Sequence, residues 1–352
     1  MKSSSRSTWS QVLSKTCAPL LAIGVALLAG CGGSGSVKDP FRPARLMVVG
    51  DEASYIGAND AGLTGAQYSV NRYKTDATTG KPTLPLTIDC LSYGNWAIRL
   101  AADINSVVAT STDELTNSPR FNFAQCNPNN KSTAATFMMA AKSQTVDSAI
   151  AAIDAHVASK GVQAGDLFAV YVGNNDIWAQ YALFAGNADA VKSGAKAAAT
   201  KLAKRINQLT DQGAKVLIVA LPDLGYSPYA RAEALRDPSM DRAALISDMV
   251  TEFNRTLKTT LIDDGRRIGL VSFDSQLSSQ LLAFRSGLGT SMGLTNIHLA
   301  ACTTASSLNC DVNTIVGDPS TWLWADGKQL GQPAQAMLAS MASSRLFYAN
   351  GF

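Results

Sequence analysis

Acidic and amide side chains follow directly after apolar runs of this sequence, and these are the groups that could do chemistry. Such side chains can transfer protons, orient a neighbouring group or donate hydrogen bonds to developing negative charge. If the apolar runs are parallel strands, their carboxyl ends meet at one edge of a sheet, so we expect one site there. The positions concerned are Gly50, Asp51 and Glu52, then Gly173, Asn175 and Asp176, and finally Asp326 with Gln329.

Four buried strands must position these groups, and we expect them at residues 44–50, 166–173, 215–221 and 268–273. Segments of helical periodicity lie at residues 96–107, 146–159, 190–212 and 243–262. Apolar strands separated by amphipathic helices predict an α/β fold, a doubly wound, flavodoxin-like parallel sheet with helices on both faces. A single domain then covers residues 41–352, with loops over one edge of the sheet at residues 74–88 and 111–132.

The first thirty residues have the layout of an export signal. A basic start precedes the apolar run at residues 18–28, which is too short to cross a bilayer. The end of the run, residues 28–31 (LAGC), resembles a bacterial lipobox, which implies that Cys31 is lipidated and that residues 31–40 form a flexible tether. We therefore expect a protein of the bacterial cell envelope, anchored to the outer membrane. The alternative is an ordinary signal peptide that happens to precede a cysteine.

The composition excludes a disordered chain and disfavours nucleic-acid binding. With 46% hydrophobic and 16% charged residues, the sequence is that of a globular protein. Its formal net charge of +3 comes entirely from Lys2, Arg6 and Lys15, which lie in the predicted signal. A neutral body without a basic run offers little to a phosphate backbone, so we expect no nucleic-acid partner.

Four of the six cysteines remain once the predicted signal and the lipidated residue are set aside. An even number in an exported domain predicts disulfides, with three possible pairings. The short interval from Cys302 to Cys310 favours a local bridge, which leaves Cys90 to pair with Cys126. A zinc site is the alternative, but the sequence has no CxxC spacing and no cluster of histidines. We therefore expect no metal and no cofactor.

Four segments, taken in order and spacing, resemble the GDSL or SGNH family of serine ester hydrolases. The resemblance covers nearly all of the chain after the signal and implies an SGNH-type fold. It also implies an acyl ester, lipid or glycan as ligand, and a cleft framed by Gly50, Asp51, Ser54, Gly173 and Asp176. The segments are Gly50-Asp51-x-x-Ser54, Gly173-Asn174-Asn175-Asp176, Leu221-Pro222-Asp223-Leu224-Gly225, and Asp326-x-x-Gln329.

The family's catalytic positions are where this sequence departs from the pattern. The nucleophilic serine is replaced by Glu52 and the base histidine by Gln329, whereas the triad acid Asp326 and the oxyanion-hole Asn175 are retained. The second family block is matched at residues 122–127, without its oxyanion-hole glycine. Acyl transfer needs an activated hydroxyl and a base, and neither is present. We therefore expect a catalytically silent relative that binds a ligand or partner. An active esterase or lipase with non-standard residues is the alternative.

Other residues could replace the missing groups, and each has a simpler role. Ser54 is expected to be a turn or helix cap, and His156 a surface or packing residue. His298 lies in a loop that could approach the cleft as a substitute base. Glu52 and Asp326 could form an acid–base pair, as in glycosidases, but acceptance of backbone N–H groups by Glu52 is the more ordinary role. The sequence predicts no oligomeric state.

Overall fold

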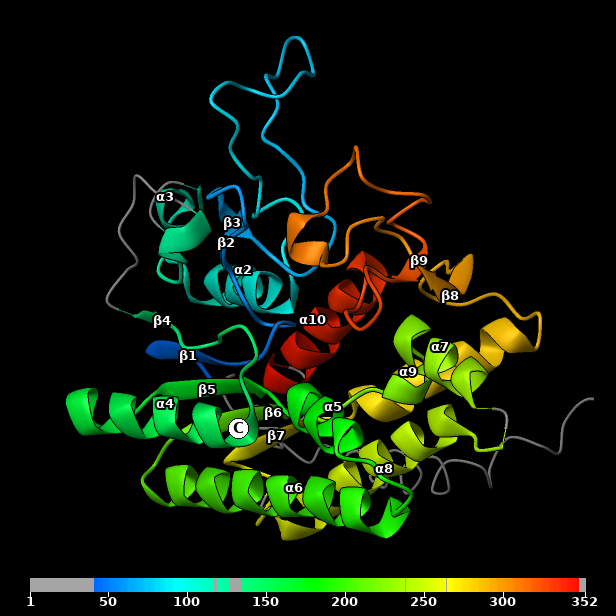
Figure 1. Cartoon of the computed structure of the whole chain (residues 1–352). Helices are drawn as coiled ribbons and strands as arrows, with labels where there is room; N and C mark the ends of the chain where they lie inside the picture. Colours follow the sequence, from blue (N-terminus) through cyan, green and yellow to red (C-terminus); the bar gives the residue numbers. More distant parts are fainter. Residues whose placement is uncertain (1–40, 117–118, 127–134, 238, 264, 348–352) are drawn as a thin grey trace, which may run out of the picture. The chain divides into compact units, whose positions relative to one another are not determined.

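The computed structural model describes residues 41–116, 119–126, 135–237, 239–263 and 265–347. The predicted signal, Cys31 and the whole tether lie outside them. A five-stranded sheet runs through this part of the chain in the order β4-β1-β5-β6-β7, and every neighbouring pair is parallel (Figure 1). The predicted doubly wound fold is thus confirmed. The strands are β1 (Arg45–Gly50), β4 (Thr136–Met138), β5 (Asp166–Tyr171), β6 (Lys215–Val219) and β7 (Ile268–Val271).

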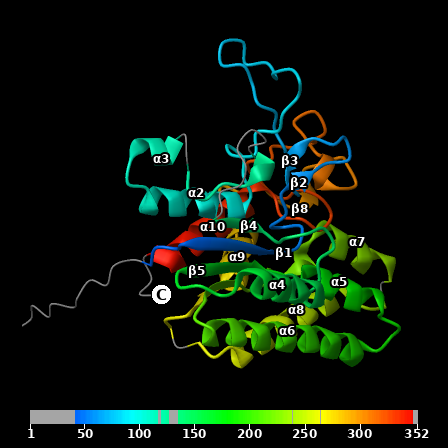
Figure 2. The ribbon, with the colours of Figure 1, turned by 90° about the vertical axis from the view of Figure 1, so that its left-hand side faces the viewer.

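Helices cover both faces of the sheet, which explains why its strands show no polar alternation. Every residue of β1 and β5 is buried. On one face lie α4 (Val146–Lys160), α6 (Ala188–Asp211) and α8 (Arg242–Thr260), and on the other α2 (Trp96–Val108) packs against α10 (Gln332–Phe347) (Figures 1 and 2). Helix α9 (Phe273–Arg285) contacts α10. The four predicted helices are found within about two residues of their expected bounds.

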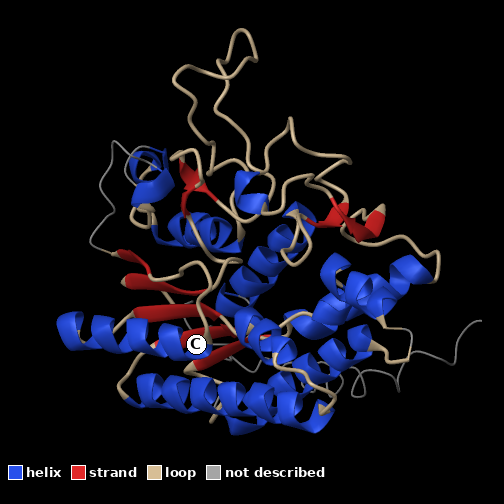
Figure 3. Cartoon of the chain, viewed as in Figure 1, coloured by secondary structure: helices blue, strands red, loops and turns tan. Residues whose placement is uncertain are grey.

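Loops and shorter elements connect the strands and the long helices (Figure 3). The segment at residues 74–88 is irregular, as expected, whereas the predicted loop at residues 111–132 contains α3 (Thr112–Thr116) and a 3-10 turn. None of the helices in the described ranges is long and apolar enough to cross a membrane. The remaining elements are β2 (Gly57–Ala58), β3 (Thr64–Ala66), α5 (Asn174–Ala182), α7 (Pro228–Arg236), β8 (Asn296–Ala300) and β9 (Trp322–Trp324).

Two disulfides hold loops that the sheet does not. Cys90 is bonded to Cys126, with 5.6 Å between their Cα atoms, and Cys302 to Cys310, with 5.8 Å. The predicted pairing is confirmed. The first bridge fastens the segment before α2 to the 3-10 turn at residues 124–126, and the second closes the loop after β8. All four cysteines are buried.

Candidate functional site at the carboxyl edge of the sheet

The turn after β1 is pressed against β5. A Cβ atom on Gly50 would lie 2.3 Å from the carbonyl oxygen of Tyr171 and 2.6 Å from the hydroxyl of Ser54, so only glycine fits there. The backbone N–H of Asp51 donates to the same Tyr171 oxygen, and the N–H of Ser54 donates to the carbonyl of Asp51. These contacts fix the backbone that carries Glu52.

The carboxylate of Glu52 accepts two short hydrogen bonds from segments far away in the sequence. Its Oε1 atom lies 2.6 Å from the backbone nitrogen of Ser143, and its Oε2 atom lies 2.7 Å from Nδ2 of Asn175. A backbone N–H and a side-chain amide are the kinds of donor that form an oxyanion hole, and here they bond the two oxygens of one carboxylate. That carboxylate belongs to the chain itself and is held by charge-assisted bonds.

The first turn of α5 supplies one of the two donors and anchors it twice. Gly173 has a φ of 130°, and a Cβ atom there would lie 2.6 Å from the ring of Phe253, so the entry to the helix requires glycine. The amide of Asn175 also donates to the carbonyl of Gln144. Asp176 accepts from the N–H of Val146 at 2.9 Å, and its burial raises its pKa to about 6. Helix α5 and the loop before α4 are therefore fixed to each other.

The other donor, Ser143, lies outside residues 122–127, where the sequence resemblance placed the second family block. In that segment, the N–H of Asn122 donates to Thr136, and the flanking Phe121 and Phe123 are buried. Ser143 follows β4 instead, with a φ of 56°, a left-handed conformation in which glycine is usual. A serine thus supplies the backbone donor at this turn.

Asp326 accepts three hydrogen bonds from backbone N–H groups. Its Oδ1 atom accepts from the N–H groups of Lys328 and Gln329 at 2.9 and 2.8 Å, and its Oδ2 atom accepts from the N–H of Ser307 at 2.8 Å. The carbonyl of Gln329 in turn accepts from the N–H of Ala325. The acid therefore closes the turn after β9 and ties it to the loop that contains Ser307.

The predicted substitutes for the catalytic residues have other partners. The hydroxyl of Ser54 is buried and accepts from the indole N–H of Trp96 at 3.0 Å. His298 lines a separate cavity of about 810 Å³, where burial and the charges of Arg231 and Arg285 lower its pKa. His156 is a packing residue, as expected. Its ring lies 4.7 Å from that of Phe137 and 6.0 Å from that of Phe168.

Asp51 stands beside Glu52 in the same turn. The side chain is fully buried, and its Oδ1 atom accepts a 3.2 Å bond from the N–H of Ala53. Burial, and next the charge of Glu52, raise the pKa of Asp51 to about 8. At neutral pH Asp51 is therefore largely protonated.

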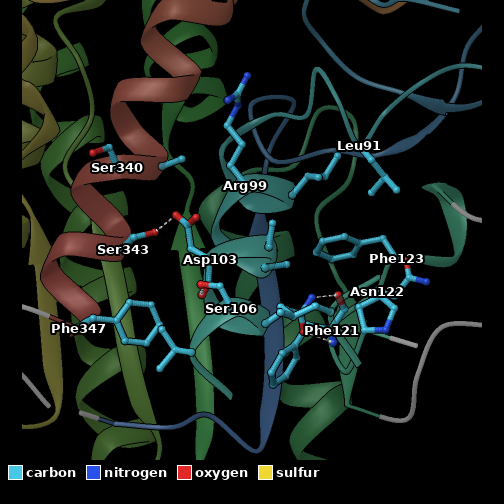
Figure 4. A pocket seen from close by; sticks show the side chains of 18 of the residues that line it. Leu91, Arg99, Asp103, Ser106, Phe121, Asn122, Phe123, Ser340, Ser343 and Phe347 are labelled. Atoms are coloured by element: carbon cyan, nitrogen blue, oxygen red, sulfur yellow. Dashed lines mark hydrogen bonds between the residues drawn. The ribbon is translucent and has the colours of Figure 1, made fainter. Parts of the chain in front are cut away.

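A second cavity, of about 840 Å³, lies away from the strand ends. It is formed by α2, α10 and residues 119–123, and Figure 4 shows Asp103 of α2 bonded to Ser343 of α10 across it. Neither this cavity nor the one beside His298 is lined by Glu52 or Asn175. The N–H of Ser143 and the amide of Asn175 are thus bonded to Glu52, and neither of these two cavities opens onto them.

Comparison with known proteins finds likeness in structure alone. No protein-family model matches the sequence, and no characterised relative matches it. A catalytic mutant of an acetylxylan esterase from Geobacillus stearothermophilus aligns with a TM-score of 0.44 and 10% identity over 88% of this chain and 96% of that one. An alpha/beta hydrolase from the metagenome of Lake Arreo gives 0.42, 11%, 86% and 96%.

A lipase/acylhydrolase from Enterococcus faecalis aligns with a TM-score of 0.38 and 10% identity, over 85% of this chain and 93% of that one. The chain is thus similar to lipase and esterase structures, as the sequence motifs predicted.

The raised pKa of Asp51 predicts a pH-dependent stability. The folded protein keeps a proton on this carboxyl up to about pH 8, whereas the unfolded chain loses it near the usual value of 3.8. The free energy of unfolding should therefore fall as pH rises between these values, by up to about 1.4 kcal/mol per pH unit from this group. Urea unfolding of wild type and Asp51→Asn across this range measures it. The fall should be weaker in the variant, and parallel curves would contradict the assignment.

Proposed function

We propose that this protein is an exported, lipid-anchored relative of the ester hydrolases that does not hydrolyse esters and binds a ligand or partner in the cell envelope. The observation that carries the proposal is the carboxylate of Glu52 between the donors of Ser143 and Asn175. An ester hydrolase needs such donors to be free for the oxyanion that forms during attack. A substrate carbonyl could reach them only by displacing a charged and doubly bonded side chain.

The chemistry of the two altered positions supports the same proposal. Glu52 has no proton to lose on attack and would repel the oxyanion, and the amide of Gln329 does not accept a proton near neutral pH. In serine hydrolases, loss of the nucleophile or the base alone reduces turnover about a million-fold, roughly 8 kcal/mol of transition-state stabilisation. Binding does not require either group.

The contacts of Ser54, Asp326 and His298 in the described structure disfavour each of them as a substitute for the missing nucleophile or base. Ser54 lies next to the site in sequence, but its hydroxyl is buried and bonded to an indole. Asp326 accepts three backbone N–H groups, which disfavours both its role as an orienting acid and an acid–base pair with Glu52. His298 lines another cavity. The alternative, an active hydrolase with non-standard residues, would need Glu52 itself to react.

Assays of ester hydrolysis test the silence of the site. Wild type should hydrolyse short-chain p-nitrophenyl esters no faster than Glu52→Ala and should not be labelled at a serine by a fluorophosphonate probe. Because nucleophile and base act as a unit, Glu52→Ser and Gln329→His should each gain nothing. The double variant should gain weak hydrolysis, since Ser143 and Asn175 are then free to bind an oxyanion, although Asp326 is already engaged.

The proposal of silence is refuted by hydrolysis in wild type that Glu52→Ala abolishes. That result would make Glu52 a participant in the chemistry. Asp51→Asn serves as a matched control, because it changes a neighbouring buried acid and leaves the donor pair and Glu52 in place.

Anchoring is the second part of the proposal and rests on the sequence at residues 28–31, which lies outside the described residues. The wild-type protein should appear in the membrane fraction and incorporate a fatty-acid analogue. Cys31→Ala should be unlabelled and remain soluble or uncleaved. Cys17→Ala is the control, because this cysteine lies inside the predicted signal and should leave labelling intact. Labelling of Cys31→Ala at the wild-type level would exclude anchoring through Cys31.

A further inference from the structure

The turn that Asp326 closes also carries a half-buried ammonium group on an aromatic surface. The Nζ atom of Lys328 lies 4.3 Å from the centre of the Tyr229 ring and 5.1 Å from that of Trp178, and the two rings pack edge to face at 5.3 Å. The N–H of Tyr229 donates to the carbonyl of Gly327, which holds the ring beside the turn. Both rings attract the cation through their faces.

The acidic groups that attract this ammonium are already bonded to other donors. Asp326, Glu52 and Glu233 all act on the charge of Lys328, while its burial lowers its pKa. Asp326 accepts from three backbone N–H groups, and Glu52 from two donors. Glu233 accepts from Tyr181 and pairs with Arg236. In the described ranges, no ion pair is formed by the Lys328 ammonium.

The acidic groups near Glu52 and the ammonium of Lys328 differ in their capacity to bind a ligand. The carboxylates are satisfied acceptors, so a cationic or amine-bearing ligand would have to displace bonds that already exist. The ammonium of Lys328 has three N–H groups and no carboxylate bound to it in the described ranges. Being half-buried, it would attract an anion more strongly than a fully hydrated lysine does.

We propose that Lys328 is the group that binds the anionic part of a ligand, a carboxylate or a phosphate, beside the rings of Trp178 and Tyr229. This inference rests on the proposed function, because it names the chemistry of the ligand that the silent site would take. The ring of Tyr229 is partly exposed and offers apolar surface for the rest of the ligand, whereas Trp178 is buried and supports that ring. Asp326 positions the ammonium by fixing the turn that carries it.

Calorimetric titration of the full-length protein tests the proposal with four probes. They are inorganic phosphate, glucose 6-phosphate, glucuronate and neutral glucose. Wild type should bind at least one of the three anions, and should bind it more tightly than it binds neutral glucose. Lys328→Gln, which removes the charge, should weaken anion binding at least about tenfold. Lys204→Gln is the matched control, because this lysine is exposed on α6, and it should bind as wild type does.

A second measurement keeps the test independent of how well the variant folds. In wild type, a bound anion should slow the acylation of Lys328 by an amine-reactive ester, mapped by mass spectrometry, and leave that of Lys204 unchanged. Equal binding to inorganic phosphate and glucose 6-phosphate would identify the free ion as sufficient, which still supports the assignment.

The proposal is overturned if no anion binds to wild type, or if Lys328→Gln binds as tightly as wild type does. Its failure is distinguishable from that of the proposed function. Ester hydrolysis by wild type would refute the proposal that the site is catalytically silent and would leave the role of Lys328 open to the binding test. A protein that neither hydrolyses esters nor binds any of the three anions would refute only the role of Lys328.

Discussion

The hydrogen bonds from Ser143 and Asn175 to the carboxylate of Glu52 join the turn after β1, the loop after β4 and the start of α5. Each segment is fixed locally by close packing at Gly50 or Gly173, or by the bond from Val146 to Asp176. Without the carboxylate, two donors at the edge of the sheet would lose their acceptor, at about 1–3 kcal/mol for each one that stays buried. The residue that replaces the nucleophilic serine, Glu52, thus also links these three segments through its carboxylate.

The acidic side chains at the carboxyl edge of the sheet are either protonated or bonded to N–H donors. Two neighbouring acids begin the turn, but burial keeps Asp51 largely protonated at neutral pH, and the carboxylate of Glu52 accepts from two donors. Asp326 is similarly satisfied by backbone N–H groups. The acids of this edge thus accept hydrogen bonds that hold loops in place, and the proposed role of Lys328 in binding an anion builds on this arrangement.

The sequence predicted the features of the fold that depend on the pattern of apolar residues and on the order of segments along the chain. Four strands, four helices and both disulfides follow from such patterns, and so does the meeting of Glu52 with Asn175. Strand β4 was missed because three residues at an edge give no periodicity. Ser143 was missed with it, since its left-handed backbone has no glycine to reveal it. The hydrogen bond from Ser307 to Asp326 was also hidden, because Ser307 reaches it only through the fold.

The occupation of the donor pair by Glu52 is the central claim, and nuclear magnetic resonance tests it most directly. The measurement compares the amide proton of Ser143 and the side-chain amide protons of Asn175 in wild type and Glu52→Ala. Protons bonded to a carboxylate should resonate downfield in wild type, move upfield in the variant and return when acetate is added, because acetate can refill the vacated position. Resonances that are the same in both proteins, and indifferent to acetate, would contradict the claim.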